Sequence, residues 1–226
     1  MTALDVRALD VATPLGPARV VVTGPPDDVR GTLVLGHGAG GGVDSADLTA
    51  VTQAAAGTGW RVLGVEQPWR VAGRRIAPAP PRLDLAWRAV LDRLRADGLL
   101  TGPLVLGGRS AGARVACRSA DDQGAAGVVA LAFPLHPPGR PEKSRAGELA
   151  LVAVPLLVVQ GETDAFGAPA EVRAALAEVR GAQVTAVPGD HGLRKNVAAV
   201  TGAVIGWLAA LSARHAGAFP GSRPRA

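Results

Sequence analysis

The feature that most constrains this chain is a Gly-x-Ser-x-Gly pattern that directly follows a short apolar run. Leu104–Leu106 are apolar, Gly108, Ser110 and Gly112 form the pattern, and an alanine-rich, helix-compatible segment comes next. In a sharp strand–turn–helix connection the serine stands at the turn, and the residues two before and two after it must be small. Such a serine is positioned to act as a nucleophile. The alternative is a glycine-rich turn that merely contains a serine, because short patterns recur by chance.

The rest of the chain predicts an α/β fold. Apolar runs alternate with helix-like segments from about residue 30 onward, which indicates a mostly parallel sheet with helices on both faces. A leading antiparallel hairpin is expected from Val6–Val11 and Ala18–Thr23. The expected parallel strands are Gly31–Leu35, Arg61–Val65, Leu104–Leu106, Gly127–Phe133, Leu156–Gln160 and Gln183–Val187. The expected helices are Ala46–Ala56, Leu83–Ala96, Ala111–Ser119, Ala170–Val179 and Lys195–Ala213.

The length of 226 residues suits one domain with a substantial core. We find no repeat and no linker, so residues 1–216 are expected to form that domain and residues 217–226 a flexible C-terminal tail. No apolar stretch approaches the length needed to cross a bilayer, and the N-terminal residues contain no hydrophobic signal core. No membrane association is therefore expected.

Charge and cysteine content narrow the class of function. The net charge is +5, but the arginines are scattered and no aromatic-interleaved basic stripe is present, so nucleic-acid binding is not expected. Cys117 is the single cysteine and cannot form an internal disulfide, which favours a cytoplasmic protein. We expect its side chain to pack against the sheet as a small apolar group.

A serine nucleophile needs a histidine base, and that base needs a carboxylate to fix its tautomer. In the elbow arrangement an acid and then a histidine follow the serine, each just after a strand. Asp164 and His191 each follow an expected strand. Both should therefore lie at the carboxyl edge of the sheet beside Ser110. Glu162 and Asp190 are the nearest alternatives for the acid.

Negative charge develops on the substrate oxygen during attack, so hydrogen-bond donors must already point at it. The backbone N–H of Ala111 is one expected donor. The second should come from the glycine-rich loop after the first parallel strand, and Ala39 N–H is the expected group. His37 is expected to support this loop rather than to transfer protons.

The same loop has a second interpretation. Residues 36–41 satisfy the G-x-G-x-x-G pattern after a strand, and Glu66 ends the next strand, where a dinucleotide-binding fold has its ribose-binding acid. This interpretation leaves Ser110, Asp164 and His191 unexplained. A dinucleotide-binding protein is therefore the less favoured alternative.

Several longer segments carry a family resemblance: Pro68-Trp69, Gly108–Arg114, Phe133–Lys143 and Gln160–Gly167. With these the chain resembles α/β-hydrolases of the dienelactone-hydrolase-like group. More narrowly, it resembles the predicted hydrolases related to the testis-expressed and NSL-complex subunit 3 proteins, over about residues 30–210. The resemblance implies an α/β-hydrolase fold and a serine-hydrolase site. Dienelactone hydrolases proper use a cysteine nucleophile, whereas this chain has Ser110.

The segment Phe133–Pro141 follows the strand after the elbow, where many relatives of this kind insert a lid. Here it is short and proline-rich, so a minimal lid and an open site are expected. The residues expected to contact substrate are Trp69, Arg70, Arg109 and His136. Two alternatives stay open: His136 stabilises its loop, and Arg109 pairs with a carboxylate such as Glu66.

Together these patterns predict a serine hydrolase that cleaves a small ester or thioester through an acyl-enzyme, without a metal or an organic cofactor. Some eukaryotic relatives of the resembled family are subunits of chromatin assemblies. A non-catalytic interaction subunit on a hydrolase scaffold is therefore the main alternative, and a protein partner or a homodimer stays open.

Overall fold

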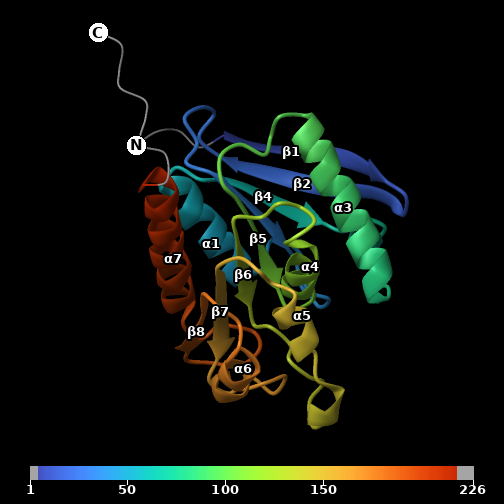
Figure 1. Ribbon diagram of the computed structural model, residues 1–226. Helices are drawn as coiled ribbons and strands as arrows, with labels where there is room; N and C mark the ends of the chain where they lie inside the picture. The colour runs from blue at the N-terminus through green and yellow to red at the C-terminus, as the bar shows by residue number, and fades with distance from the viewer. Residues whose placement is uncertain (1–4, 218–226) are drawn as a thin grey trace.

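The computed structural model describes residues 5–217, and its centre is one eight-stranded sheet (Figure 1). The strand order is β1-β2-β4-β3-β5-β6-β7-β8. The strands are β1 Asp5–Thr13, β2 Gly16–Gly24, β3 Thr32–Gly36, β4 Arg61–Glu66, β5 Leu104–Arg109, β6 Gly127–Leu131, β7 Leu156–Gly161 and β8 Ala182–Val187. Strand β2 runs antiparallel to β1 and β4, and all other neighbouring pairs are parallel. The predicted sheet with its leading hairpin is confirmed.

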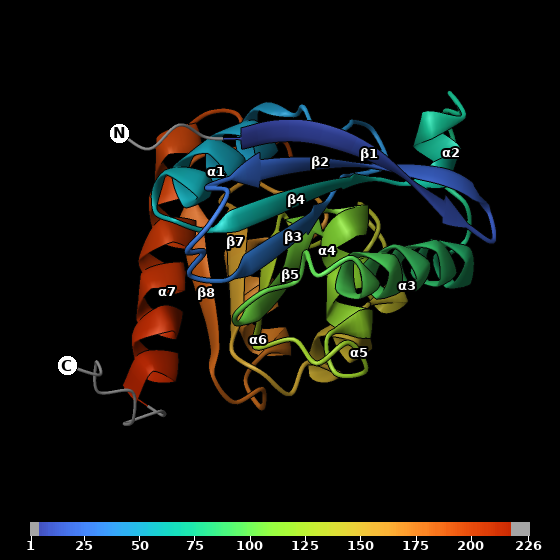
Figure 2. The same cartoon turned by 90° about the horizontal axis from the view of Figure 1, so that it is seen from above.

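Helices cover both faces of this sheet. They are α1 Ala46–Gly57, α2 Pro68–Val71, α3 Pro80–Ala96, α4 Ala111–Ser119, α5 Ala146–Ala150, α6 Pro169–Ala175 and α7 Val197–Gly217, with a 3-10 turn, η1, at Pro141–Lys143. Helices α1 and α7 lie on one face, and α3, α4 and α5 lie on the other (Figures 1 and 2). Each face has its own buried core, one centred on α1 and α7 and the other on α3 and α4. Cys117 is buried in the second core, as expected.

Element boundaries differ from the prediction where caps and turns decide them. Helix α3 begins at Pro80, earlier than expected, because proline fits the first turn of a helix. Strand β6 ends at Leu131 because Ala132 has a positive φ of 46°. Helix α6 ends at Ala175 rather than at residue 179. The short elements α2, η1 and α5 were not expected from the sequence.

Helix α7 corrects two expectations. It begins at Val197, after Asn196, whose side-chain oxygen accepts a hydrogen bond from the Ala199 N–H at 3.0 Å. It extends through Gly217, beyond the expected end at Ala213, and residues 218–226 of the expected tail lie outside the described part of the chain.

The statement that no stretch is long and apolar enough to cross a membrane was wrong for the same helix. Val197–His215 meets both criteria of length and composition. Alanine and glycine are frequent in this helix and only weakly apolar, so its sequence does not stand out as a membrane-spanning stretch. Val204 and Leu208 of this helix are buried in the core shared with α1, and a helix packed on a sheet meets the same criteria.

The tightest packing lies where β5 turns into α4 against the end of β3. A Cβ atom at Gly112 would overlap the carbonyl group of Gly36, and so would one at Gly108. Gly108 also has φ of +154°, which side-chain-bearing residues rarely adopt. The Gly-x-Ser-x-Gly pattern is therefore required by the close approach of two parallel strands and a helix.

This packing can be tested with two matched substitutions within helices. Gly112→Ala is expected to lower the free energy of unfolding by about 1–3 kcal/mol, because the new methyl group has no space. Gly206→Ala in α7, where nothing lies within 4 Å, is expected to raise it by about 0.5–1 kcal/mol. Urea denaturation measures both. Equal stability of Gly112→Ala and the wild type would contradict the packing described here.

Candidate active site

Ser110 lies between β5 and α4, at the carboxyl edge of the sheet. Strands β3 and β5 are the neighbours at which the strand order reverses, and ligands bind at such points in open α/β sheets. The Ser110 backbone has φ 52° and ψ −107°, a strained conformation for a residue with a side chain. Its N–H donates to the Leu131 carbonyl at 2.9 Å, which fixes the turn beside β6.

The structure brings Ser110, His191 and Asp164 into one hydrogen-bonded chain. His191 Nε2 lies 2.9 Å from Ser110 Oγ, and His191 Nδ1 lies 2.8 Å from Asp164 Oδ2. A carboxylate only accepts, so the Nδ1 proton donates to Asp164 and Nε2 can accept the serine proton. The alternative acid Asp190 instead accepts a hydrogen bond from the Gly192 N–H. No contact of Glu162 with His191 occurs among the described residues.

The Asp164 side chain is 0% exposed and accepts hydrogen bonds from three residues, one of which is His191. The Gln160 side-chain amide donates to Asp164 Oδ2 at 2.9 Å, and the Phe166 N–H donates to Oδ1 at 2.8 Å. Gln160 also donates to the carbonyls of Phe133 and Gly167. Sequence reasoning missed this role of Gln160. The available signal was a glutamine at the end of an otherwise apolar strand.

The glycine-rich loop lies directly beside the serine. A Cβ atom at Gly38 would lie 3.6 Å from Ser110 Cβ, which places Ala39 in the next position along the loop. Within residues 5–217, neither Ala39 N–H nor Ala111 N–H donates a hydrogen bond to another residue. Both groups are therefore available to an oxygen atom outside the protein.

His37 supports this loop through hydrogen bonds of both ring nitrogens. Its Nδ1–H donates to the Gly38 carbonyl at 2.8 Å, and its Nε2 accepts the Gln67 N–H at 3.2 Å. Burial is the main reason that the pKa of His37 lies below its usual value. The ring is therefore a neutral structural group, in agreement with the expectation that it does not transfer protons.

The Arg109 side chain is engaged within the protein, which favours its alternative role of pairing with a carboxylate. Its side chain is 13% exposed, and its Nε lies 3.2 Å from Oδ2 of Asp47, which is 2% exposed. A second guanidinium nitrogen donates to the His191 carbonyl at 2.9 Å. Gly38 also packs against Arg109. Arg109 therefore joins α1, the glycine loop and the His191 loop, and its acidic partner is Asp47 rather than Glu66.

His136 is likewise held by its own surroundings, which favours the alternative that it stabilises its loop. Its Nδ1–H donates to the Pro137 carbonyl at 3.0 Å, and its Nε2 lies 3.1 Å from Glu171 on α6. These two contacts raise the pKa of His136 above its ordinary value. His136 joins its loop to α6, as the alternative interpretation had it.

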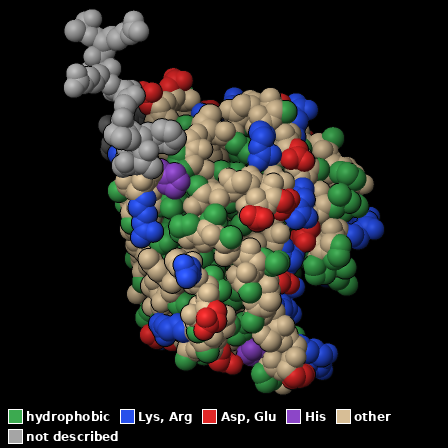
Figure 3. Space-filling model, viewed as in Figure 1, with side chains coloured by type: hydrophobic (Ala, Val, Ile, Leu, Met, Phe, Trp, Pro, Cys, Tyr) green, Lys and Arg blue, Asp and Glu red, His purple; other side chains and the backbone are tan. Residues whose placement is uncertain are grey.

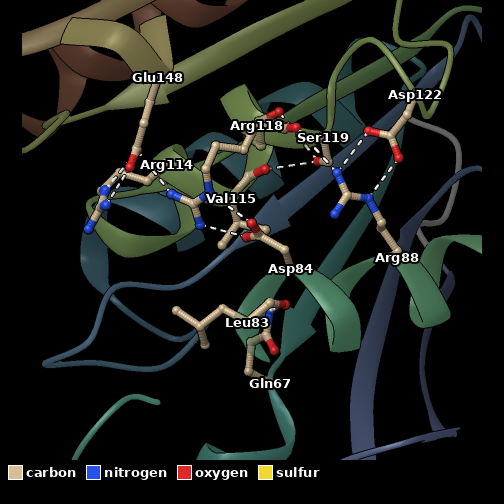
Figure 4. A network of polar contacts seen from close by, with 11 residues as sticks. Gln67, Leu83, Asp84, Arg88, Arg114, Val115, Arg118, Ser119, Asp122 and Glu148 are labelled. Carbon is tan, nitrogen blue, oxygen red and sulfur yellow. Dashed lines mark hydrogen bonds and ion pairs between the residues drawn. The ribbon is translucent and has the colours of Figure 1, made fainter. Parts of the chain in front are cut away.

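The segment between β6 and β7 is more structured than expected, since it contains η1 and α5. Glu148 of α5 accepts hydrogen bonds from Arg114 and Arg118 of α4, and Arg118 also pairs with Asp84 of α3 (Figure 4). Burial alone would raise the pKa of Glu148, but the two arginines outweigh burial and lower it. The network holds α5 against α4.

The His191 side chain keeps 21% of its surface exposed, so the site is open to solvent.

Of the remaining residues predicted to contact substrate, Trp69 packs beside His37 and Arg70 is an exposed residue of α2. Trp69 is buried, and its ring centre is 5.5 Å from that of His37. It lines a narrow hollow that also reaches Ala111. Arg70 is exposed and is absent from the lining of this hollow and of the cavity next to it.

The structure gives little support for three other ligands: a dinucleotide, a metal ion and a nucleic acid. A dinucleotide-binding loop leads straight into a helix, but here α1 begins only at Ala46, after the cap residue Ser45. Among residues 5–217, no three His, Cys, Asp or Glu side chains form a group that could hold a metal ion. On the face seen in Figure 3, basic and acidic side chains are interspersed rather than gathered in a stripe of one sign.

Comparisons with known proteins agree with this architecture. A family described as "Alpha/beta hydrolase domain" matches residues 29–204. A serine hydrolase without a lid from Xanthomonas campestris, XC6422, is 22% identical, with a TM-score of 0.70 over 97% of each chain. Est1E from Butyrivibrio proteoclasticus is 15% identical, with a TM-score of 0.77 over 91% of this chain and 99% of that one.

A dienelactone hydrolase from Anabaena variabilis is 18% identical, with a TM-score of 0.70 over 90% of this chain and 95% of that one. These structures share the fold, and the expected fold class is thereby confirmed. The narrower resemblance to the testis-expressed and NSL-complex subunit 3 proteins stays a prediction.

The structural role of Arg109 predicts a loss of stability on substitution. Arg109→Leu leaves the buried Asp47 carboxylate without its partner and is expected to lower the free energy of unfolding by about 3–5 kcal/mol. The double variant Asp47→Leu/Arg109→Leu removes both charges and should regain most of that loss. Urea denaturation of the three proteins measures the effect. Wild-type stability of Arg109→Leu, with weaker substrate binding alone, would restore the substrate-binding role.

Proposed function

The chain belongs to the alpha/beta hydrolase domain family, and we propose that it is a serine hydrolase for small carboxylic esters or thioesters. The observation that carries the proposal is the continuous hydrogen-bonded chain from Ser110 Oγ through His191 to Asp164. In this chain each group has the partner that nucleophilic catalysis requires.

In the proposed reaction, His191 Nε2 takes the proton of the Ser110 hydroxyl while Oγ attacks the substrate carbonyl carbon. The carbonyl oxygen becomes negatively charged, and the N–H groups of Ala39 and Ala111 stabilise it. The C–O or C–S bond to the leaving group then breaks, and the proton on His191 passes to that group. Water, deprotonated by His191, attacks the carbonyl carbon of the acyl-enzyme. The bond from this carbon to Ser110 Oγ then breaks, His191 returns its proton to Oγ, and the acid is released.

Asp164 acts through His191. Its carboxylate fixes the imidazole with Nδ1 protonated, so that the lone pair on Nε2 faces Ser110, and it stabilises the imidazolium that forms. Gln160 and the Phe166 N–H hold the carboxylate oxygens in position. The aromatic ring of Phe166 lies 4.2 Å, centre to centre, from that of His191 and limits how far the imidazole can rotate.

The one thiol of the chain is not a rival nucleophile. Cys117 is buried in the core, and burial raises the pKa of its thiol to about 12. The reactive form of cysteine is the thiolate, which is scarce at neutral pH when the pKa is so high. Ser110 is therefore the proposed nucleophile.

Two further expectations stay predictions: a cytoplasmic location, and the alternative that the protein is a non-catalytic interaction subunit. The experiment below distinguishes this alternative from catalysis.

The proposal predicts labelling of the protein by a fluorophosphonate probe and hydrolysis of short p-nitrophenyl esters. Ser110→Ala should abolish labelling and lower kcat/KM by roughly four to six orders of magnitude. Ser144→Ala, in the loop before α5, is the matched control and should keep both activities. A folded wild-type protein that is neither labelled nor active would favour the interaction-subunit alternative.

A further inference from the structure

A cavity of about 420 Å³ opens between α2 and the N-terminal half of α3. Its walls are Pro68 and Trp69 of α2, Arg82 and Ala86 of α3, and, in the segment between these helices, Arg74 and Ile76–Pro78. We call it the basic cavity. Small-molecule sites typically occupy about 300–1,000 Å³, so this volume suits a small substrate.

The basic cavity carries positive charge without a neutralising partner. Arg74 and Arg82 line it, and neither forms an ion pair or a side-chain hydrogen bond within residues 5–217. The sequence from residue 67 to residue 83 contains four arginines and no acidic residue. Guanidinium groups bind carboxylate and phosphate oxygens through paired hydrogen bonds. The cavity therefore favours an anionic group.

The basic cavity lies beside a second, much smaller hollow at the start of α4. Gln67, Trp69 and Ala77 line it, and the same three residues line the narrow hollow that reaches Ala111 and Gly112, directly after Ser110. That hollow measures about 10 Å³, close to the room of a single water molecule. Trp69 and its neighbours thus form a thin wall between the cavity and the first turn of α4.

The same wall contains two polar atoms that lack a partner. Trp69 Nε1 is a donor and Gln67 Oε1 an acceptor, and both are buried without a hydrogen bond among the described residues. Both residues are 6% exposed. Leaving such groups unpaired is unfavourable, so polar atoms of a bound molecule at this wall would stabilise them.

We propose that the basic cavity binds an anionic group of the substrate, so that the enzyme prefers esters that carry a carboxylate or a phosphate. Arg74 and Arg82 would contact that group, and the rest of the substrate would extend past the wall formed by Trp69 to place the ester carbonyl at Ser110. This inference rests on the proposed function and adds a substrate class to it. A concave site of this size favours a small molecule over an acidic macromolecule, which would need a broad surface.

The test compares each anionic ester with a neutral counterpart of similar shape. Ethyl hydrogen adipate is paired with ethyl adipamate for the carboxylate, and 2-acetoxyethyl phosphate with 2-acetoxyethanol for the phosphate. The wild type is expected to show a kcat/KM about tenfold or more higher for the anionic member of at least one pair. The pair that shows it identifies the anion. Equal values within both pairs would overturn the proposal.

Matched arginine variants locate the effect. Arg74→Gln/Arg82→Gln should lower the anionic-to-neutral ratio about tenfold, a modest figure because solvent screens exposed arginines. Arg75→Gln removes a charge from the same segment outside the cavity lining and should keep the wild-type ratio. A similar fall in Arg75→Gln would overturn the proposal, because net charge rather than the cavity would then set the preference. Thermal melting checks that each variant is folded.

Direct binding separates this inference from the proposed function. The Ser110→Ala protein is titrated calorimetrically with both members of each pair, so that no turnover is needed. Tighter binding of the anionic member, lost when Arg74→Gln/Arg82→Gln is added, supports the cavity even if the wild type cleaves no ester. Equal affinities overturn the cavity even if the wild type is an active esterase. A nucleic-acid role would also overturn the proposal. It would appear as binding of an oligonucleotide that weakens equally when any of the four arginines of residues 67–83 is replaced, with no preference for anionic esters.

Discussion

The whole site depends on the absence of side chains at Gly108 and Gly112. Only without them can β5 turn sharply into α4 while the carbonyl end of β3 lies against the turn. That contact holds Ser110 in a strained backbone conformation and brings the glycine loop to its side. The parallel sheet then supplies the other two members of the site, because the loops after β7 and β8 emerge at the same edge. Fold and chemistry are therefore linked through one steric constraint.

A second requirement is to keep a carboxylate stable in the interior. The Asp164 side chain is fully buried, and such a charge is unfavourable unless hydrogen bonds replace its water. Gln160, the Phe166 N–H and His191 supply those bonds. A carboxylate held in this way needs little reorganisation when the imidazole becomes charged, which is the main physical advantage of a preformed site. Arg109 extends the same principle, since it ties the His191 loop to the buried Asp47.

The sheet and the three converging side chains could be predicted because they follow from local patterns: apolar runs, a small-residue turn, and polar residues just after strands. The partners of charged side chains could not be predicted in this way. Arg109 pairs with Asp47 of α1 and His136 with Glu171 of α6, and both acids lie far away in sequence. The sequence predicts only a loop around α5, because the ion pairs of Glu148 that hold α5 against α4 cannot be read from one sequence.

In the proposed reaction Ser110 carries the acyl group between acylation and hydrolysis. Intact-mass and peptide mass spectrometry of protein that is acid-quenched during turnover of p-nitrophenyl butyrate tests it most directly. One added butyryl group is expected, located on the peptide that contains Ser110. Turnover without any adduct, or an adduct on another residue such as Cys117, would contradict it.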